Sequence, residues 1–347
     1  MLLDGIILKG SLQFNRNRTS SAIYHLITGK KSIQTVQDAH IYQLKNFYGI
    51  NRSIHKQDFD EQINTLATEQ LINLDPSTCC SVTNKGIVWL EKHEQDLHLD
   101  NFNGLRYHAA SPVFYERLLL LIQTLSNSCN NNGSFIPVTD KAPILFWVKT
   151  FFRDLKSRKQ KFFEQLHHDI HQLLATFSDQ EASIYVDRLS GYNHYGKSKD
   201  QLAKDFQKDK LDIPLIIERM NHCMLNEIFT SRRALPAISL LAKDLENNQF
   251  ITNSASKTYQ LLLDNRSINE IGKLRGIQEN TVYDHVVEVA LFTHDFPVRH
   301  YVSETQRQQI LTAVEVDHTY KLKTIKQMVD ESISYFQIRL VLATITR

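Results

Sequence analysis

The sequence predicts a mainly α-helical protein with a small β ribbon near its N-terminus. First, its 347 residues include only 11 glycines and 7 prolines, which is few for a turn-rich β fold. Second, apolar residues recur at helical spacing along most of the chain. Third, capping boxes that begin at Ser198 and Ser267 mark helix N-termini. This length predicts two or three domains, and we place them at residues 1–98, 99–250 and 251–347.

The first predicted domain consists of helices followed by a short strand. Apolar spacing predicts a helix around residues 23–27, an interruption at 29–32 and a second helix over 33–47. A third helix is predicted over residues 58–75. The stretch CCSVTNKGIVWLEK then predicts a strand, a turn at residues 84–86 and a last helix. This order of elements, with the local pattern T-x-K-G…L, resembles a winged helix.

Several polar and basic residues of this domain are candidate DNA contacts. They flank its first two helices or lie in the first turns of the second, where short polar side chains beside lysines suit a DNA groove. They are Arg16, Arg18, Lys30, Lys31, Gln34, Thr35 and Gln37. The alternative is that Lys30 and Lys31 only solvate a turn, and the sequence leaves both interpretations open.

The middle domain is predicted to be helical and contains the densest basic stretch of the chain. Helical periodicity runs from about residue 142 to residue 177, with a break near Ser157. Three cations in it fall at helical spacing and could follow a phosphate backbone beside an aromatic face. They are Lys149, Arg153 and Lys156. The alternative is the solvated face of a core helix, so DNA contact here is an open hypothesis.

The middle domain also contains GYNHYGKS at residues 191–198, which matches the phosphate-loop pattern G-x-x-x-x-G-K-[ST]. A phosphate loop follows a buried strand, whereas helical periodicity here continues up to the motif. Its four variable positions are bulky where the backbone must curl around an anion. We therefore interpret the match as coincidental and Ser198 as the N-cap of a helix. The wider segment, residues 173–225, resembles the helix-turn-helix of sigma-factor region four.

The clearest motif of the chain is helix-turn-helix spacing at residues 254–292. A first helix precedes the capping box at Ser267, Gly276 makes the turn, and residues 279–292 form the helix expected to enter a major groove. The candidate DNA contacts are Lys273, Arg275, Asn280 and Thr281.

Three carboxylates on that last helix oppose contact with a phosphate-lined groove. They are Glu279, Asp284 and Glu288. A role in packing or in binding a protein partner is therefore the favoured interpretation of this helix.

Both ends of the chain resemble known helix-turn-helix proteins. Residues 254–292, together with LKTIKQMVDESISYFQIRLVLA, resemble the helicase-type helix-turn-helix domain at the C-terminus of some RecQ-family helicases. The stretch RNRTSSAIYHLITGKKSIQTVQDAHIYQL resembles the opening of a Firmicutes family of helix-turn-helix proteins that are encoded beside a RecQ-type helicase.

The resemblance implies a non-catalytic DNA-binding adaptor that acts with a RecQ-family DNA helicase in DNA repair or recombination. Because the sequence has no helicase motor motif, we do not expect the chain to unwind DNA by itself. A sequence-specific transcription regulator is the alternative, although no coiled-coil heptad or other dimer element is evident. The oligomeric state is left open.

Charge and residue types disfavour several other functions. The net charge is +2, which argues against a strong nonspecific grip on DNA, so we expect binding that is weak or depends on DNA structure. Four cysteines without a C-x-x-C predict reduced thiols. His167 and His171 have the spacing of a zinc helix but lack the base and a third ligand.

We therefore expect no enzymatic activity, no cofactor and no metal. The N-terminal apolar stretch has no signal-peptide features, and the apolar runs are too short to span a bilayer. These features predict a cytoplasmic protein without membrane contact.

Overall fold

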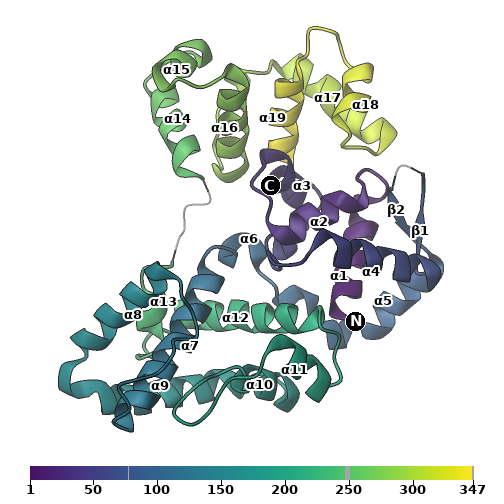
Figure 1. Ribbon diagram of the computed structural model, residues 1–347. Helices are drawn as coiled ribbons and strands as arrows, with labels where there is room; N and C mark the ends of the chain where they lie inside the picture. The colour runs from purple at the N-terminus through teal and green to yellow at the C-terminus, as the bar shows by residue number, and fades with distance from the viewer. Residues whose placement is uncertain (77, 247–250, 346–347) are drawn as a thin grey trace. The chain divides into compact units, whose positions relative to one another are not determined.

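The computed structural model describes residues 1–76, 78–246 and 251–345. The prediction of a mainly helical fold with a small β ribbon is confirmed (Figure 1). The chain forms two compact units. Unit 1 holds the described residues of 1–6, 49–55 and 91–247, and unit 2 holds those of 7–48, 56–90 and 248–347.

The predicted domains follow chain order, whereas the compact units do not. Unit 2 joins the helices of the first predicted domain to those of the third. The predicted boundary at 250/251 adjoins residues 247–250, which lie outside the described residues, as do residues 346–347.

Unit 1 is a set of packed helices linked by loops and 3-10 turns. Its elements are η2 (Leu99–Asn101), α6 (Gly104–Tyr107), α7 (Ala110–Cys129), α8 (Ala142–Asp154), η3 (Lys156–Arg158), α9 (Lys159–Leu174), α10 (Asp179–Val186), α11 (Lys199–Asp205), α12 (Asp212–Thr230) and α13 (Ser239–Ala242). The predicted break near Ser157 is confirmed, because η3 separates α8 from α9 and Lys156 takes a φ of 49°.

The core of unit 1 is organised around α12. Side chains from several of its faces are buried, including Ile213, Leu215, Met220, Leu225 and Ile228, each 0% exposed. Such all-round burial is typical of a central core helix rather than a surface helix. Helix α12, the last helix of the segment that resembles sigma-factor region four, therefore packs in the core of unit 1.

Unit 2 combines an N-terminal and a C-terminal set of elements. The N-terminal set is α2 (Ser20–Thr28), α3 (Ile33–Ile41), η1 (Lys45–Phe47), α4 (Lys56–Thr68), β1 (Ile72–Leu74) and β2 (Cys80–Val82). The C-terminal set is α14 (Asn253–Leu263), α15 (Ile268–Arg275), α16 (Glu279–Phe292), η4 (Val298–His300), α17 (Glu304–Asp317), α18 (Leu322–Met328) and α19 (Tyr335–Ile345). Two further helices, α1 (Leu2–Phe14) and α5 (Asn84–Leu97), contribute residues to both units.

Helix α16 lies at the centre of unit 2. Helices α14 and α19 pack against it, and α3 contacts both α16 and α19. Gln37 on α3 donates a hydrogen bond to the backbone carbonyl of Arg339 at 2.7 Å. The ring of His40 meets that of Phe292 edge-on, with 5.0 Å between their centroids. These contacts join the N-terminal helices to the C-terminal ones in a shared core.

Two of the predicted N-terminal helices are shorter than expected. The helix predicted over 33–47 ends at Ile41, because Gln43 adopts a left-handed φ of 55° and the chain continues into a 3-10 turn. The helix predicted over 58–75 ends at Thr68, and its last residues form β1.

The β ribbon is present, but the turn predicted after it is helical. Strand β2 confirms the predicted strand and pairs antiparallel with β1, so that Ile72 faces Val82. Residues 84–86 form the first turn of α5 instead of a loop. Gly86 is needed there because a Cβ atom would lie 2.2 Å from the carbonyl oxygen of Leu71.

Candidate nucleic-acid interface

Helices α14, α15 and α16 form a helix-turn-helix. The predicted capping box of α15 is confirmed, since the Ser267 side chain accepts from the Glu270 N–H while the Glu270 side chain accepts from the Ser267 N–H. Gly276 ends α15 in the left-handed region with a φ of 63°. A Cβ atom on Gly272 would lie 3.1 Å from the Ile277 carbonyl oxygen, so a small residue lets the chain turn closely back.

Only the first turn of α16 is freely exposed. Val282, Val286 and Val289 are each 0% exposed and pack in the core of the unit. Asn280 and Thr281 are exposed, as predicted for DNA contacts at the start of a recognition helix. The remainder of the helix serves the core, which limits any groove contact to its N-terminal turn.

The three carboxylates of α16 make internal contacts. Glu279 is exposed and accepts a hydrogen bond from the Asn269 side chain at 2.8 Å. Asp284 forms an ion pair with Arg339 at 2.7 Å. Glu288 accepts the backbone N–H of Thr252, and burial raises the pKa of its carboxyl group. Two of these candidate partner contacts, Asp284 and Glu288, thus already stabilise the unit itself.

The two cationic side chains of α15 differ in their contacts and in their exposure. Arg275 donates to both the backbone carbonyl and the hydroxyl of Ser254 at 2.9 Å, and also to Thr258, so its guanidinium group ties α15 to α14. Lys273 is exposed and can meet a phosphate.

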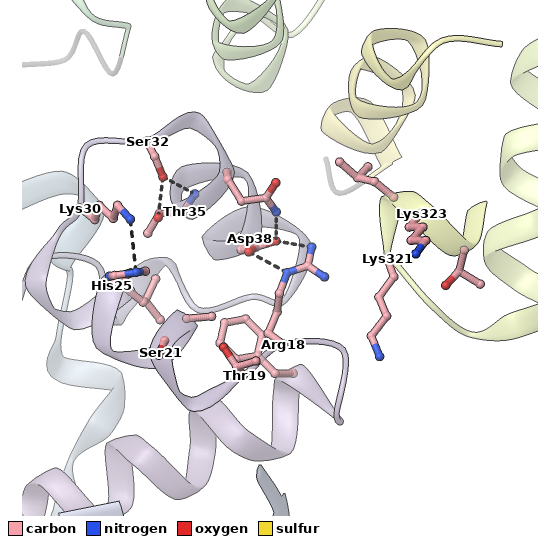
Figure 2. Close-up of a pocket in the computed structure, with 16 residues that line it drawn as sticks. Arg18, Thr19, Ser21, His25, Lys30, Ser32, Thr35, Asp38, Lys321 and Lys323 are labelled. Carbon is pink, nitrogen blue, oxygen red and sulfur yellow. Dashed lines mark hydrogen bonds and ion pairs between the residues drawn. The ribbon is translucent and has the colours of Figure 1, made fainter. Parts of the chain in front are cut away.

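A basic cleft of about 650 Å³ lies within unit 2 between α2, α3 and the segment at the start of α18. Figure 2 shows Lys321 and Lys323 on one side of this cleft, opposite Arg18 and Asp38. The polar and charged residues of its lining are Arg18, Thr19, Ser21, His25, Lys30, Ser32, Gln34, Thr35, Asp38, Lys321, Lys323 and Thr324. We call this site the basic cleft.

Positively charged side chains outnumber negatively charged ones in the lining of the basic cleft. Arg18 donates two hydrogen bonds to Asp38, at 2.9 and 2.8 Å, and although burial opposes the charged form, this partner raises the pKa of Arg18. Burial and the charges of Lys30 and Lys56 lower the pKa of His25, which disfavours its charged form. The exposed lysines of the cleft thus have no acidic residue of its lining left to pair with.

The first turn of α3 contributes polar groups to the basic cleft. Ser32 is the N-cap of α3 and accepts the Thr35 N–H at 3.2 Å, while the two hydroxyls lie 2.8 Å apart (Figure 2). Gln34 is exposed and donates to Asp38 at 3.0 Å. Thr35 and Gln37, by contrast, are buried, at 7% and 2% exposed, so neither is accessible for the DNA contact that the sequence predicted; Gln37 donates instead to the backbone carbonyl of Arg339.

The other predicted N-terminal contacts lie at the surface. Lys30 and Lys31 are exposed in the turn between α2 and α3, and Lys30 Nζ lies 3.3 Å from His25 Nε2. Arg16 is also exposed and donates to the Ser81 hydroxyl of β2. Sequence reasoning missed Lys321 and Lys323, because nothing in the local pattern places residues near 320 beside residues near 30.

The predicted basic stripe of the middle domain is exposed in unit 1. Lys149 and Arg153 lie on α8, whereas Lys156 lies in η3 and so is not on the same helix. Phe146 is 73% exposed and precedes Lys149 by one helical turn. We call Phe146, Lys149, Arg153 and Lys156 the α8 surface.

The GYNHYGKS segment makes a loop between two helices. Helix α10 precedes it, and Ser198 caps α11 in a capping box with Gln201, as predicted. Lys197 binds Asp187 at 2.8 Å and Asp205 at 2.9 Å. Its ammonium group is thus held by carboxylates rather than presented to a phosphate.

Other motifs lead to no assembled site in the described ranges. His167 and His171 are exposed on α9, and within residues 1–76, 78–246 and 251–345 no three His, Cys, Asp or Glu side chains are grouped to hold a metal ion. The four cysteines are free, as expected, with Cys79 and Cys80 buried. Searched over the same ranges, the helices include none with the length and apolarity to cross a membrane.

Comparison with known proteins supports the helix-turn-helix assignment. Residues 254–342 match a protein family described as a helix-turn-helix domain, which implies DNA binding. The chain is 27% identical over 347 residues to Protein YpbB of Bacillus subtilis (strain 168), covering 98% of this chain and 96% of that protein. No solved structure matches the chain.

Proposed function

We propose that this chain is a non-catalytic DNA-binding adaptor that acts with a RecQ-family DNA helicase in DNA repair or recombination. Unit 2 supplies a duplex-binding site through the basic cleft. The helix-turn-helix match supports this placement, because the matched residues 254–342 include Lys321 and Lys323.

The observation that carries DNA binding is the excess of cations in the basic cleft. Asp38 is already paired with Arg18, so Lys30, Lys321 and Lys323 are left to neutralise phosphates. The half-buried Ser32 hydroxyl and the exposed Gln34 amide beside them supply hydrogen bonds of the kind that position a backbone. Each phosphate that a lysine neutralises releases counterions, and binding therefore weakens as salt rises.

Removal of the two cleft lysines near α18 tests this site. For Lys321→Ala/Lys323→Ala, we expect the slope of log affinity against log salt on duplex DNA to fall by about 1.8, at 0.9 per phosphate. The loss should be similar for all duplex sequences. The matched control is Lys92→Ala/Lys208→Ala, at exposed lysines outside the cleft, and should leave the slope unchanged. An unaltered slope in the cleft variant would contradict the proposed site.

The helicase partnership rests on the resemblance of both chain ends to proteins of helicase systems. The net charge of +2 also fits an adaptor, since charge alone gives this chain little general affinity for DNA. We expect a tagged chain to retain a RecQ-family helicase from nuclease-treated lysate and to change the unwinding rate of the purified enzyme. If the purified pair neither associates nor alters unwinding, the partnership is wrong while DNA binding by the cleft still stands.

The exposed Asn280 and Thr281 favour one second candidate, a sequence-specific transcription regulator. Both side chains lie on the first turn of α16, where they could contact base edges. Selection from a random duplex library separates the two functions. A regulator enriches one operator with roughly a thousandfold or greater preference over other DNA, whereas the adaptor enriches none.

A further inference from the structure

One face of α8 in unit 1 presents an aromatic ring among cations. Phe146 is 73% exposed, and Lys149 and Arg153 follow it on the same helical face. The Arg153 side chain is 77% exposed. The ring and the two charged groups are therefore available to one ligand at the same time.

The core of unit 1 does not use the Phe146 ring. Ile144 and Val148 are the side chains of α8 that are buried. Trp147 stacks on Phe151 with 4.9 Å between the ring centroids and an interplanar angle of 9°. Folding therefore accounts for Trp147 and Phe151 but leaves Phe146 in solvent.

Positive charge dominates the chain from residue 149 to residue 161. Its basic residues are Lys149, Arg153, Lys156, Arg158, Lys159 and Lys161. The one acidic residue in this stretch, Asp154, is 69% exposed and lies 3.8 Å from Arg153, so solvent screens the pair. The Lys159 ammonium group lies 3.9 Å from the Phe152 ring centroid. The α8 surface thus combines positive potential with the accessible ring of Phe146.

We propose that the α8 surface binds single-stranded nucleic acid. An unpaired base stacks on the face of Phe146, and the neighbouring phosphates are neutralised by Lys149 and Arg153. Base–aromatic stacking with a cationic track for the backbone is the usual basis of sequence-tolerant binding to single strands.

The same features disfavour a duplex and a protein as the ligand. In a duplex the base faces are stacked inside, so an exposed ring on a convex helix finds only edges and phosphates. The cores of protein interfaces are depleted of lysine, whereas Phe146 is bordered by Lys149 on its own helical face. The inference does not rest on the basic cleft, because that site belongs to unit 2.

The first measurement compares stacking variants of the full chain on oligothymidine of about 15 nucleotides, a length suited to one single-strand site. We expect Phe146→Ala to weaken binding roughly fivefold or more. Phe146→Leu keeps an apolar side chain without a ring and should weaken binding similarly. Because Phe146 is exposed, both variants should retain the circular dichroism spectrum of the parent chain.

The second measurement distinguishes the binding of bases from the binding of phosphates. It also distinguishes the α8 surface from the basic cleft. On an abasic oligomer of equal length, Phe146→Ala should bind as the parent chain does. Lys149→Ala/Arg153→Ala should lower the salt slope on oligothymidine by about 1.4, at 0.7 per phosphate. Lys321→Ala/Lys323→Ala should leave oligothymidine binding intact while it weakens duplex binding. Unchanged oligothymidine affinity in Phe146→Ala would overturn the proposal. If that variant kept its oligothymidine affinity but no longer retained the helicase, the α8 surface would be a protein-docking surface.

Discussion

The basic cleft of unit 2 and the α8 surface of unit 1 are both cationic, but they hold their cations in different ways. In the cleft, the Arg18 side chain is 15% exposed and is fixed to Asp38 by two hydrogen bonds. On the α8 surface, Arg153 is 77% exposed and meets its neighbour Asp154 only at 3.8 Å. The first site thus has a mostly buried ion pair beside its exposed lysines, whereas the cations of the second site are all exposed.

This difference indicates what each site can recognise. Cations on both sides of a cleft that is organised by a fixed ion pair suit a ligand whose phosphates have a fixed spacing, as in duplex DNA. Exposed cations around an exposed ring suit a flexible strand whose bases are unstacked. Net charge alone would not separate the two sites, whereas burial and the position of the aromatic ring do.

The largest expected effect comes from breaking the pair that supports the cleft. Asp38→Asn leaves the charge of Arg18 mostly buried without its carboxylate, so we expect unit 2 to lose about 3 kcal/mol of its free energy of unfolding. The matched change on the α8 surface, Asp154→Asn, breaks an exposed pair and should alter stability by less than about 0.5 kcal/mol. Denaturant titration of both variants measures the free energies of unfolding to be compared.

Ligand binding by the same two variants sharpens the contrast. Asp38→Asn should weaken duplex binding under conditions in which unit 2 is partly unfolded, and Asp154→Asn should leave oligothymidine binding unchanged or slightly stronger. Equal losses of stability in the two variants would show that the cleft is not organised by its buried pair.

Local features of the fold could be predicted from the sequence. The capping boxes at Ser198 and Ser267 and the break near Ser157 depend on a few neighbouring residues, and the structure confirms them. The helix end at Ile41 was missed because it depends on a left-handed residue, Gln43, of a type that does not signal a stop.

The composition of the candidate site could be predicted only in part. Arg18, Lys30 and Gln34 were identified because they flank the first two predicted helices or open the second, whereas Lys321 and Lys323 line the same cleft through tertiary packing. Gln37 was predicted to contact a groove because it is a polar residue near the start of a helix beside lysines. Packing of α3 against α16 and α19 covers that position, and no local pattern predicts such a contact.

A somewhat smaller effect is expected from pH, through His40 at the contact between α3 and α16. Burial and the charge of Lys45 lower the pKa of His40 to about 4, below its ordinary value of about 6.5. Between these values the unfolded chain binds more protons than the folded one, so stability falls as pH falls. We expect this group to cost about 2 kcal/mol of stability at pH 5 relative to pH 7.

The control for the pH effect is His40→Gln, which cannot titrate. It should unfold with a shallower dependence on pH between about 6.5 and 4, measured by denaturant titration at several pH values. Duplex binding by the parent chain should weaken over the same range if the packing of α3 supports the cleft. A parent and a variant with parallel pH profiles would mean that His40 is protonated without cost in the folded unit.

The smallest effect is expected on the first turn of α16, whose residues belong to neither of the two sites. Asn280→Ala removes an exposed amide but no positive charge, so duplex affinity should change by less than about threefold and the salt slope should not change. Lys273→Ala is the matched control, since it removes an exposed cation from the adjacent helix and should lower the slope by about 0.9 if it meets a phosphate. A loss in Asn280→Ala of about 1–3 kcal/mol confined to one base pair would place base readout on α16 and favour the transcription regulator. A small, sequence-independent change would leave duplex affinity to phosphate contacts in the cleft, as expected for an adaptor that must bind DNA of any sequence.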